Sequence, residues 1–130
     1  MLAKRVHGDA EGRMIISMKI EFEKNMQIAS ELLSYCHLKG ASEYHIDMSV
    51  AGGETFFVIT ASPADVSCEE MEQLHRKLDV PRQREMEQDF WELGGLSETA
   101  SELLLIGMMV DDADVSLFDR VLTIKLKRKA

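Results

Sequence analysis

Two β-hairpin patterns, one in the middle of the chain and one near its C-terminal end, place the tightest limit on the fold. In the first, apolar and polar residues alternate over 44–50, Gly52-Gly53 supplies a turn, and 56–59 is an apolar run. We expect this run to be buried on both faces. The second pattern covers 115–127 and ends in a strand with a basic outer face. A hairpin needs further elements to cover its apolar face, so helices are expected around both.

The chain before the first hairpin shows two different periods. Apolar residues at every second position over 16–22 predict a half-buried strand, formed by Ile16, Met18, Ile20 and Phe22. Over 26–39 the apolar residues recur at helical spacing instead. Asn25 is the predicted N-cap of this helix and Gly40 its stop.

Three helical patterns separate the two hairpins. Ser67 and Glu70 have the spacing of a capping box, which starts a helix whose apolar stripe reaches residue 78. Pro81 opens a second helix. Its expected buried face consists of Met86, Phe90 and Leu93. The run 103–110 is apolar on all sides, which predicts a helix buried in the core.

The predicted order is β-α-ββ-α-α-α-ββ, and it indicates an α+β fold of two layers. A mixed sheet would be covered on one face by the helices. The chain has 130 residues, which fits one domain. We assign residues 14–130 to this domain and 1–13 to a flexible N-terminal arm, because that segment is polar and contains two glycines.

The charge balance excludes some classes of partner. Fifteen basic and 23 acidic side chains leave a formal net charge of −8, which argues against binding to nucleic acid or to an anionic membrane. Residues 1–13 contain no apolar run of the kind found in a secretory signal, and the two cysteines form no CxxC motif. A cytoplasmic protein is therefore the expectation.

The succession of elements and several local patterns resemble the ATP-binding domain of histidine kinases and of the wider gyrase–histidine kinase–MutL family. Residues 32–39 are similar to the family's first helix, and the hairpin 44–60 is similar to the strands that lead to its Asp-x-Gly-x-Gly turn. Residues 101–106 stand where its buried helix begins, and 122–127 match its closing strand. The resemblance covers roughly residues 14–127 and implies the Bergerat fold.

The residues that carry the chemistry of that family are replaced in this chain. Tyr35 stands where the first helix supplies an Asn ligand for Mg²⁺, and a phenol is a poor ligand for this hard cation. Ala61 replaces the Asp that hydrogen-bonds adenine. Residues 62–65 contain none of the glycines of the following turn. In place of the lid glycines, 97–102 contain Glu98 and Glu102, whose carboxylates would repel phosphate. The resemblance therefore implies a degenerate member that has lost ATP binding.

These replacements predict a non-catalytic regulatory or protein-interaction domain rather than an enzyme. We expect no cofactor, and we expect the partner to be another protein or a second copy of the chain. The expected partner surface lies where the family has its lid. It consists of Phe90, Trp91, Gly94 and Gly95.

Two alternatives remain open. A divergent kinase-like or anti-sigma-like regulator would bind ATP with magnesium in a pocket lined by Tyr35, Ala61, Ser62 and Asp65. A small α+β domain of another topology, such as a ferredoxin-like sandwich, would bind a small ligand instead. We expect no metal site, because the four histidines and two cysteines show no recognised ligand spacing.

Overall fold

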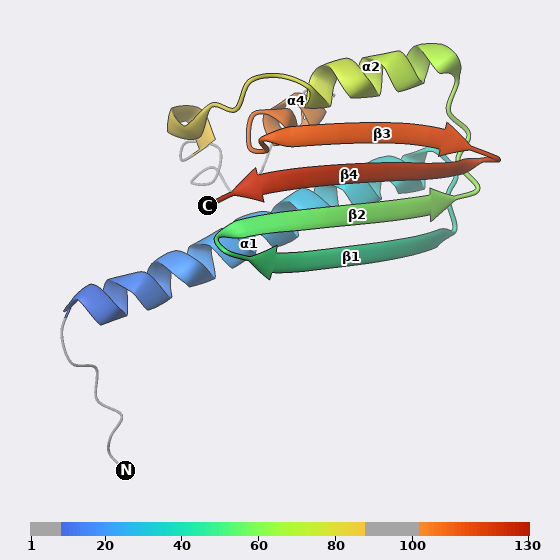
Figure 1. Ribbon diagram of the computed structural model, residues 1–130. Coiled ribbons are helices and arrows are strands. Elements are labelled where there is room, and N and C mark those ends of the chain that lie inside the picture. Colours follow the sequence, from blue (N-terminus) through green and yellow to red (C-terminus); the bar gives the residue numbers. More distant parts are fainter. Residues whose placement is uncertain (1–8, 88–101) are drawn as a thin grey trace.

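The computed structural model describes residues 9–87 and 102–130, with side chains from Ile15 onward and, after the gap, from Leu103 onward. A four-stranded sheet is covered on one face by helices, which makes an α+β fold of two layers (Figure 1). The elements in chain order are α1 (Asp9–Leu38), β1 (Glu43–Ala51), β2 (Glu54–Ser62), α2 (Cys68–Leu78), α4 (Glu102–Gly107), β3 (Asp112–Phe118) and β4 (Val121–Lys129).

The sheet has the strand order β1-β2-β4-β3, and every neighbouring pair is antiparallel. Both predicted hairpins are confirmed. The predicted mixed sheet is wrong, because it required an additional strand at the N-terminal end. The central pair is β2 and β4, where Ile59 lies opposite Ile124 and Phe57 opposite Leu126. These inner positions form the middle of the core.

The predicted strand at 16–22 is wrong, because these residues belong to the long helix α1. Ile28 and Leu32 are buried, and Asn25 lies one turn before Ile28 on nearly the same face of the helix. Asn25 is therefore not an N-cap. It is 3% exposed, and its side-chain amide donates a hydrogen bond to Thr55 Oγ1 at 3.0 Å.

The N-terminal part of α1 projects beyond the sheet (Figure 1). The helix begins at Asp9, so it includes residues 9–13, which the sequence pattern assigned to the flexible arm. Residues 1–8 lie outside the described part of the chain.

The core lies between the helices and the inner face of the sheet. Leu122 and Ile124 of β4 contribute fully buried side chains, and α1 contributes Leu32. Leu74 and Leu78 of α2 close the core on the other side. Because α1, α2 and α4 all lie on this face, the opposite face of the sheet has no described helix over it (Figure 1).

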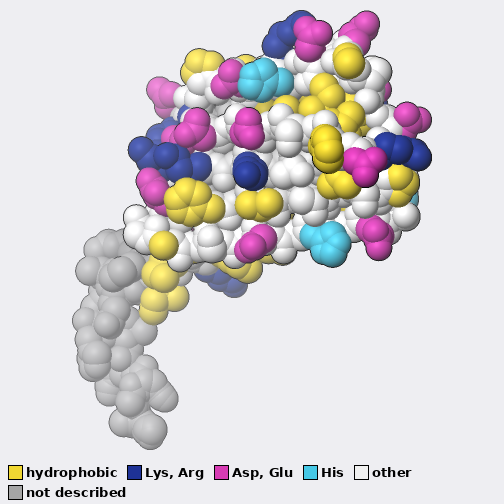
Figure 2. Space-filling model, turned by 45° about the vertical axis from the view of Figure 1, so that its right-hand side comes forward, with side chains coloured by type: hydrophobic (Ala, Val, Ile, Leu, Met, Phe, Trp, Pro, Cys, Tyr) yellow, Lys and Arg dark blue, Asp and Glu magenta, His cyan; other side chains and the backbone are white. Residues whose placement is uncertain are grey.

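The open outer face corrects the expectation that 56–59 is buried on both sides. Phe57 and Ile59 point inward and are buried, whereas Phe56 points outward and is 40% exposed. In Figure 2 charged and apolar side chains mix over the surface of the body. The final strand behaves as predicted, with Leu122, Ile124 and Leu126 inside and Lys125 outside.

The capping box of α2 is confirmed in both directions. Ser67 Oγ accepts from the Glu70 amide at 3.1 Å, and a Glu70 carboxylate oxygen accepts from the Ser67 amide at 3.0 Å. The next helical turn begins at residue 84 rather than at Pro81. Met86 is 42% exposed, so its predicted place in the core is wrong. The residues predicted to share its face, Phe90 and Leu93, lie outside the described residues.

The apolar run 103–110 forms a shorter helix than expected. Helix α4 ends at Gly107, and the buried side chains of Met109 and Val110 follow it. Leu104 is 37% exposed, so the helix is not buried on all sides. The run is therefore divided between the short helix and the connection that leads into β3.

Candidate functional site

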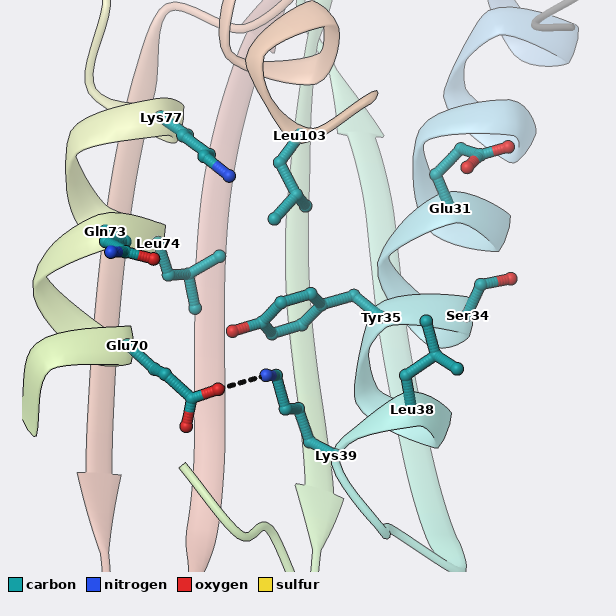
Figure 3. Close-up of a pocket in the computed structure, with 10 residues that line it drawn as sticks. All are labelled: Glu31, Ser34, Tyr35, Leu38, Lys39, Glu70, Gln73, Leu74, Lys77 and Leu103. Atoms are coloured by element: carbon teal, nitrogen blue, oxygen red, sulfur yellow. Dashed lines mark hydrogen bonds and ion pairs between the residues drawn. The ribbon is translucent and has the colours of Figure 1, made fainter. Parts of the chain in front are cut away.

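A cavity of about 290 Å³ lies between α1 and α2, and Leu103 of α4 closes one side of it (Figure 3). This volume is at the lower end of the range of ligand pockets, roughly 300–1,000 Å³. The Tyr35 ring extends from α1 across the space between the two helices, and the Lys77 side chain extends into the same space from α2 (Figure 3). The remaining lining residues are Glu31, Ser34, Leu38, Lys39, Glu70, Gln73 and Leu74.

An ion pair between Lys39 and Glu70 lies at one end of this cavity and joins α1 to α2. The same ammonium group lies 5.5 Å from the centre of the Tyr35 ring, a cation–π arrangement. Burial raises the pKa of Tyr35 to about 12, and the Glu70 charge acts in the same direction. The phenol therefore stays protonated at neutral pH, and the hydrogen bond from Lys39 holds the pKa of Glu70 below its ordinary value.

The four residues of the alternative nucleotide site occupy different surroundings. Tyr35 lines the cavity between the helices, whereas Asp65 lines a neighbouring hollow at the C-terminal end of α1. Ala61 is 1% exposed and belongs to the core. Ser62 is half-buried at the end of β2, where its carbonyl oxygen accepts a hydrogen bond from the Ser42 amide at 3.0 Å.

The two cysteines differ in exposure. Cys36 is buried in the core and Cys68 is exposed at the start of α2. Burial raises the pKa of the Cys36 thiol to about 11, so a nucleophilic thiolate is disfavoured there. Within residues 9–87 and 102–130, no three His, Cys, Asp or Glu side chains gather in a way that could hold a metal ion.

A second feature is an apolar surface made by α1 and β1, which we call the α1–β1 face. On α1, Met18, Phe22 and Met26 follow one another at four-residue spacing and therefore lie along one side of the helix. Phe22 is 51% exposed and Met26 is 46% exposed. In Figure 2, apolar side chains gather at the lower left edge of the body.

Strand β1 continues this face. Ile46 lies opposite the buried Ile59 and Val50 lies opposite the buried Thr55, so both point to the helix-covered side of the sheet. Both nevertheless remain exposed, Ile46 at 44% and Val50 at 62%. A groove of about 400 Å³ runs between the two elements, with Met18, Phe22 and Val50 among its lining residues. An exposed apolar surface of this kind is typical of an interaction site.

Beneath this groove lies a buried ionic cluster that the sequence patterns did not predict. Arg128 is 1% exposed and Glu87 is 4% exposed, and their side chains form an ion pair. Lys24 of α1 donates to the same Glu87 carboxylate at 3.2 Å, and Arg82 contacts it at 3.1 Å. The cluster joins α1, β4 and the segment after α2.

The predicted final strand ended at residue 127, so the sequence pattern did not place Arg128 in the sheet. The alternation of β4 contains the missing signal, because Arg128 has the same parity as Leu122, Ile124 and Leu126 and must share their inward face. Its charge is compensated there by Glu87 and Glu21, and its Nε donates to the Met109 carbonyl oxygen at 3.0 Å. No described side-chain nitrogen or oxygen is buried without a hydrogen-bond partner.

The partner surface predicted from Phe90, Trp91, Gly94 and Gly95 lies outside the described residues. No described helix is long and apolar enough to cross a membrane. Comparison with protein-family models gives no match, and comparison with the curated proteins gives none either.

Proposed function

We propose that the chain is a non-catalytic protein-interaction domain, built on a scaffold similar to the ATPase domain of histidine kinases. The observation that carries the proposal is the α1–β1 face, where Phe22 and Val50 expose more than half of their surface beside a groove. Leaving apolar surface in water costs about 25 cal/mol per Å² relative to burying it. A partner that covers this face would recover that free energy.

The order of elements supports the kinase-like scaffold. From α1 onward, the hairpin β1–β2, α2, α4 and the hairpin β3–β4 follow in the order that the resemblance implies, and both hairpins share one sheet. The strand before α1 and the mixed sheet, which the resemblance also implied, are not formed by the described residues. The surroundings of the replaced residues support the loss of nucleotide binding. The Tyr35 ring and the Lys39–Glu70 ion pair occupy the region between α1 and α2, and Ala61 is buried in the core.

Site-specific photo-crosslinking tests the interaction surface. A photoreactive amino acid at Phe22 should give a crosslinked product in the cell that makes the protein, either a covalent dimer or a heavier adduct. The same amino acid at Ser116, an exposed position on β3 at the far edge of the sheet, is the matched control and should give no such product. The proposed function fails if Phe22 captures no protein, or if both positions capture the same ones.

Isothermal titration with ATP and Mg²⁺ tests the loss of nucleotide binding. We expect no saturable heat, for two reasons. Tyr35 stands in place of the Asn that would bind Mg²⁺, and the Glu70 carboxylate in the cavity repels phosphate. The competing hypothesis, a divergent nucleotide-binding regulator, requires binding with a Kd in the micromolar range or below. Such binding, if abolished by replacing Lys39 with alanine, would contradict the proposed loss.

A further inference from the structure

We infer that the partner of the α1–β1 face is a second copy of this chain, which pairs antiparallel along β1 around a two-fold axis at Ile46. This inference rests on the proposed function and names its partner. Strand β1 is an edge of the sheet, and no described residue pairs with its outer side. An exposed edge strand is a template for pairing with another strand.

The backbone of β1 is oriented for such pairing. Ala51 and Glu54 close the two-residue turn Gly52-Gly53, in which both glycines have positive φ, so Ala51 and Glu54 form a hydrogen-bonded pair. Hydrogen-bonded and non-hydrogen-bonded pairs alternate along an antiparallel ladder. The odd-numbered residues of β1 are therefore directed at β2, and the N–H and C=O groups of its even-numbered residues point outward from the sheet edge.

A two-fold axis at Ile46 uses these outward groups. It places Ile46 opposite Ile46 of the second copy and Tyr44 opposite its Met48, so three even-numbered residues on each strand exchange hydrogen bonds. Of these three residues, Ile46 belongs to the α1–β1 face, and Val50 of the same face lies one residue beyond the paired stretch. Pairing therefore brings the two Ile46 side chains together on the helix-covered side of an eight-stranded sheet, with the α1 part of each apolar face at either end of the paired stretch.

The polar side chains of His45 and Asp47, on the other side of β1, select this axis. His45 and Asp47 are both exposed, and neither forms an ion pair with a described residue. Their neighbours on strand β2 are the uncharged Thr60 and Val58. An axis at Ile46 places His45 of each copy opposite Asp47 of the other, twice by symmetry. An axis one residue further, at Asp47, would oppose two aspartates, which is unfavourable.

Other positions of the axis give a shorter paired stretch or a less favourable set of side chains opposite each other. An axis at Tyr44 would pair Glu43 with His45, but only residues 43–45 of the strand would overlap. An axis at Met48 would leave Asp47 opposite the uncharged Ser49. The axis at Ile46 pairs residues 43–49 and is the one that combines long overlap with a histidine opposite an aspartate at two contacts.

Charge exchange between positions 45 and 47 tests the axis. Sedimentation equilibrium at micromolar concentration should show a dimer of the full chain. His45→Glu places a glutamate opposite Asp47 at both contacts, so it should raise the dimer Kd at least tenfold. Asp47→Lys removes the acceptor for His45 and should also weaken the dimer. The double variant H45E/D47K opposes glutamate and lysine twice and should restore association to within about threefold of the natural chain.

Mixing the two single variants gives a sharper outcome. When a copy with H45E pairs with a copy with D47K, the introduced glutamate faces the introduced lysine at one contact. At the other contact the natural Asp47 faces the natural His45, so the mixture should form a heterodimer more tightly than either variant forms a dimer with itself. Asp114→Lys, an equivalent charge change on the opposite edge strand β3, is the control and should leave the dimer intact. Positions 45, 47 and 114 are all exposed, so the variants should fold. Circular dichroism of each variant checks this.

Two results would overturn the inference. One is a purified natural chain that stays monomeric at these concentrations, and the other is a dimer that the His45 and Asp47 variants leave unchanged. If the crosslink at Phe22 then captures a different protein, the proposed function holds and only the second copy is excluded. If Phe22 captures nothing, both proposals fail.

Discussion

Replacement of Glu87 by glutamine is expected to lower the free energy of unfolding at pH 7 by about 3–5 kcal/mol, the usual cost of removing one partner from a buried ion pair. The variant keeps the size and the polar end of the side chain but removes its charge. The substitution leaves three buried cations without the charge of Glu87. Their side chains are only 1% (Arg128), 7% (Lys24) and 7% (Arg82) exposed. Urea unfolding monitored by circular dichroism measures the difference.

The effect should depend on pH in a defined direction. Burial pushes the pKa of Glu87 upward, but the charges of Arg128 and Arg82 outweigh it and hold the pKa below its ordinary value of 4.5. A carboxylate with a lowered folded-state pKa contributes its stability fully above that ordinary value, and the contribution is lost as the pH falls through the folded-state pKa. The difference between the natural chain and the variant should therefore shrink below pH 4.5.

Glu85→Gln is the matched control, because Glu85 lies on the same segment but is exposed. This variant should stay within about 0.5 kcal/mol of the natural chain. If the Glu85 and Glu87 variants were equally stable at pH 7, Glu87 would not compensate the buried cations.

Replacement of Gly107 by alanine is expected to destabilise the fold by about 1–3 kcal/mol or more, although alanine is the better helix former. Gly107 ends α4 where it packs on the C-terminal end of α2. A Cβ atom there would lie 2.2 Å from the Lys77 carbonyl oxygen and 3.1 Å from the Leu78 Cα atom. Both contacts are with the backbone, so a change of side-chain rotamer cannot relieve them. The unfolding midpoint in urea measures the loss.

Ser30→Ala provides the contrast on α1. Ser30 is exposed, so the substitution adds helix propensity without a steric clash and should leave the stability unchanged or raise it by up to about 0.5 kcal/mol. A Gly107 variant as stable as the natural chain would mean that α4 and α2 do not pack as closely as this geometry requires.

Local patterns predicted the elements that depend on local chemistry. Gly52 and Gly53 have the positive φ values that their turn requires, and the turn at Asp119-Arg120 has positive φ at both residues. The Ser67–Glu70 capping box forms within one helical turn. These features involve residues a few positions apart, so the sequence specifies them without knowledge of the rest of the chain.

The strand predicted at 16–22 shows where local patterns fail. Apolar and polar residues alternate there, as in a strand. In the structure, however, Lys24 and Asn25 are buried on the same side of helix α1 as Ile28 and Leu32. Lys24 pairs with Glu21 on its own helix, and its closer ion pair is with Glu87, 63 positions away. A window of the sequence contains no information about that distant carboxylate.

The sequence by itself determined the two hairpins, the capped helix α2 and the inward set of β4, because side-chain period and turn chemistry are local. The tertiary structure alone decided that the sheet is antiparallel, that α1 is a single long helix and that Glu87 is the partner of the inward-facing Arg128. It also decided that the apolar residues of β1 stay uncovered. These outcomes depend on which charges meet and which faces are covered after the chain has folded, and residues far apart in the sequence determine both.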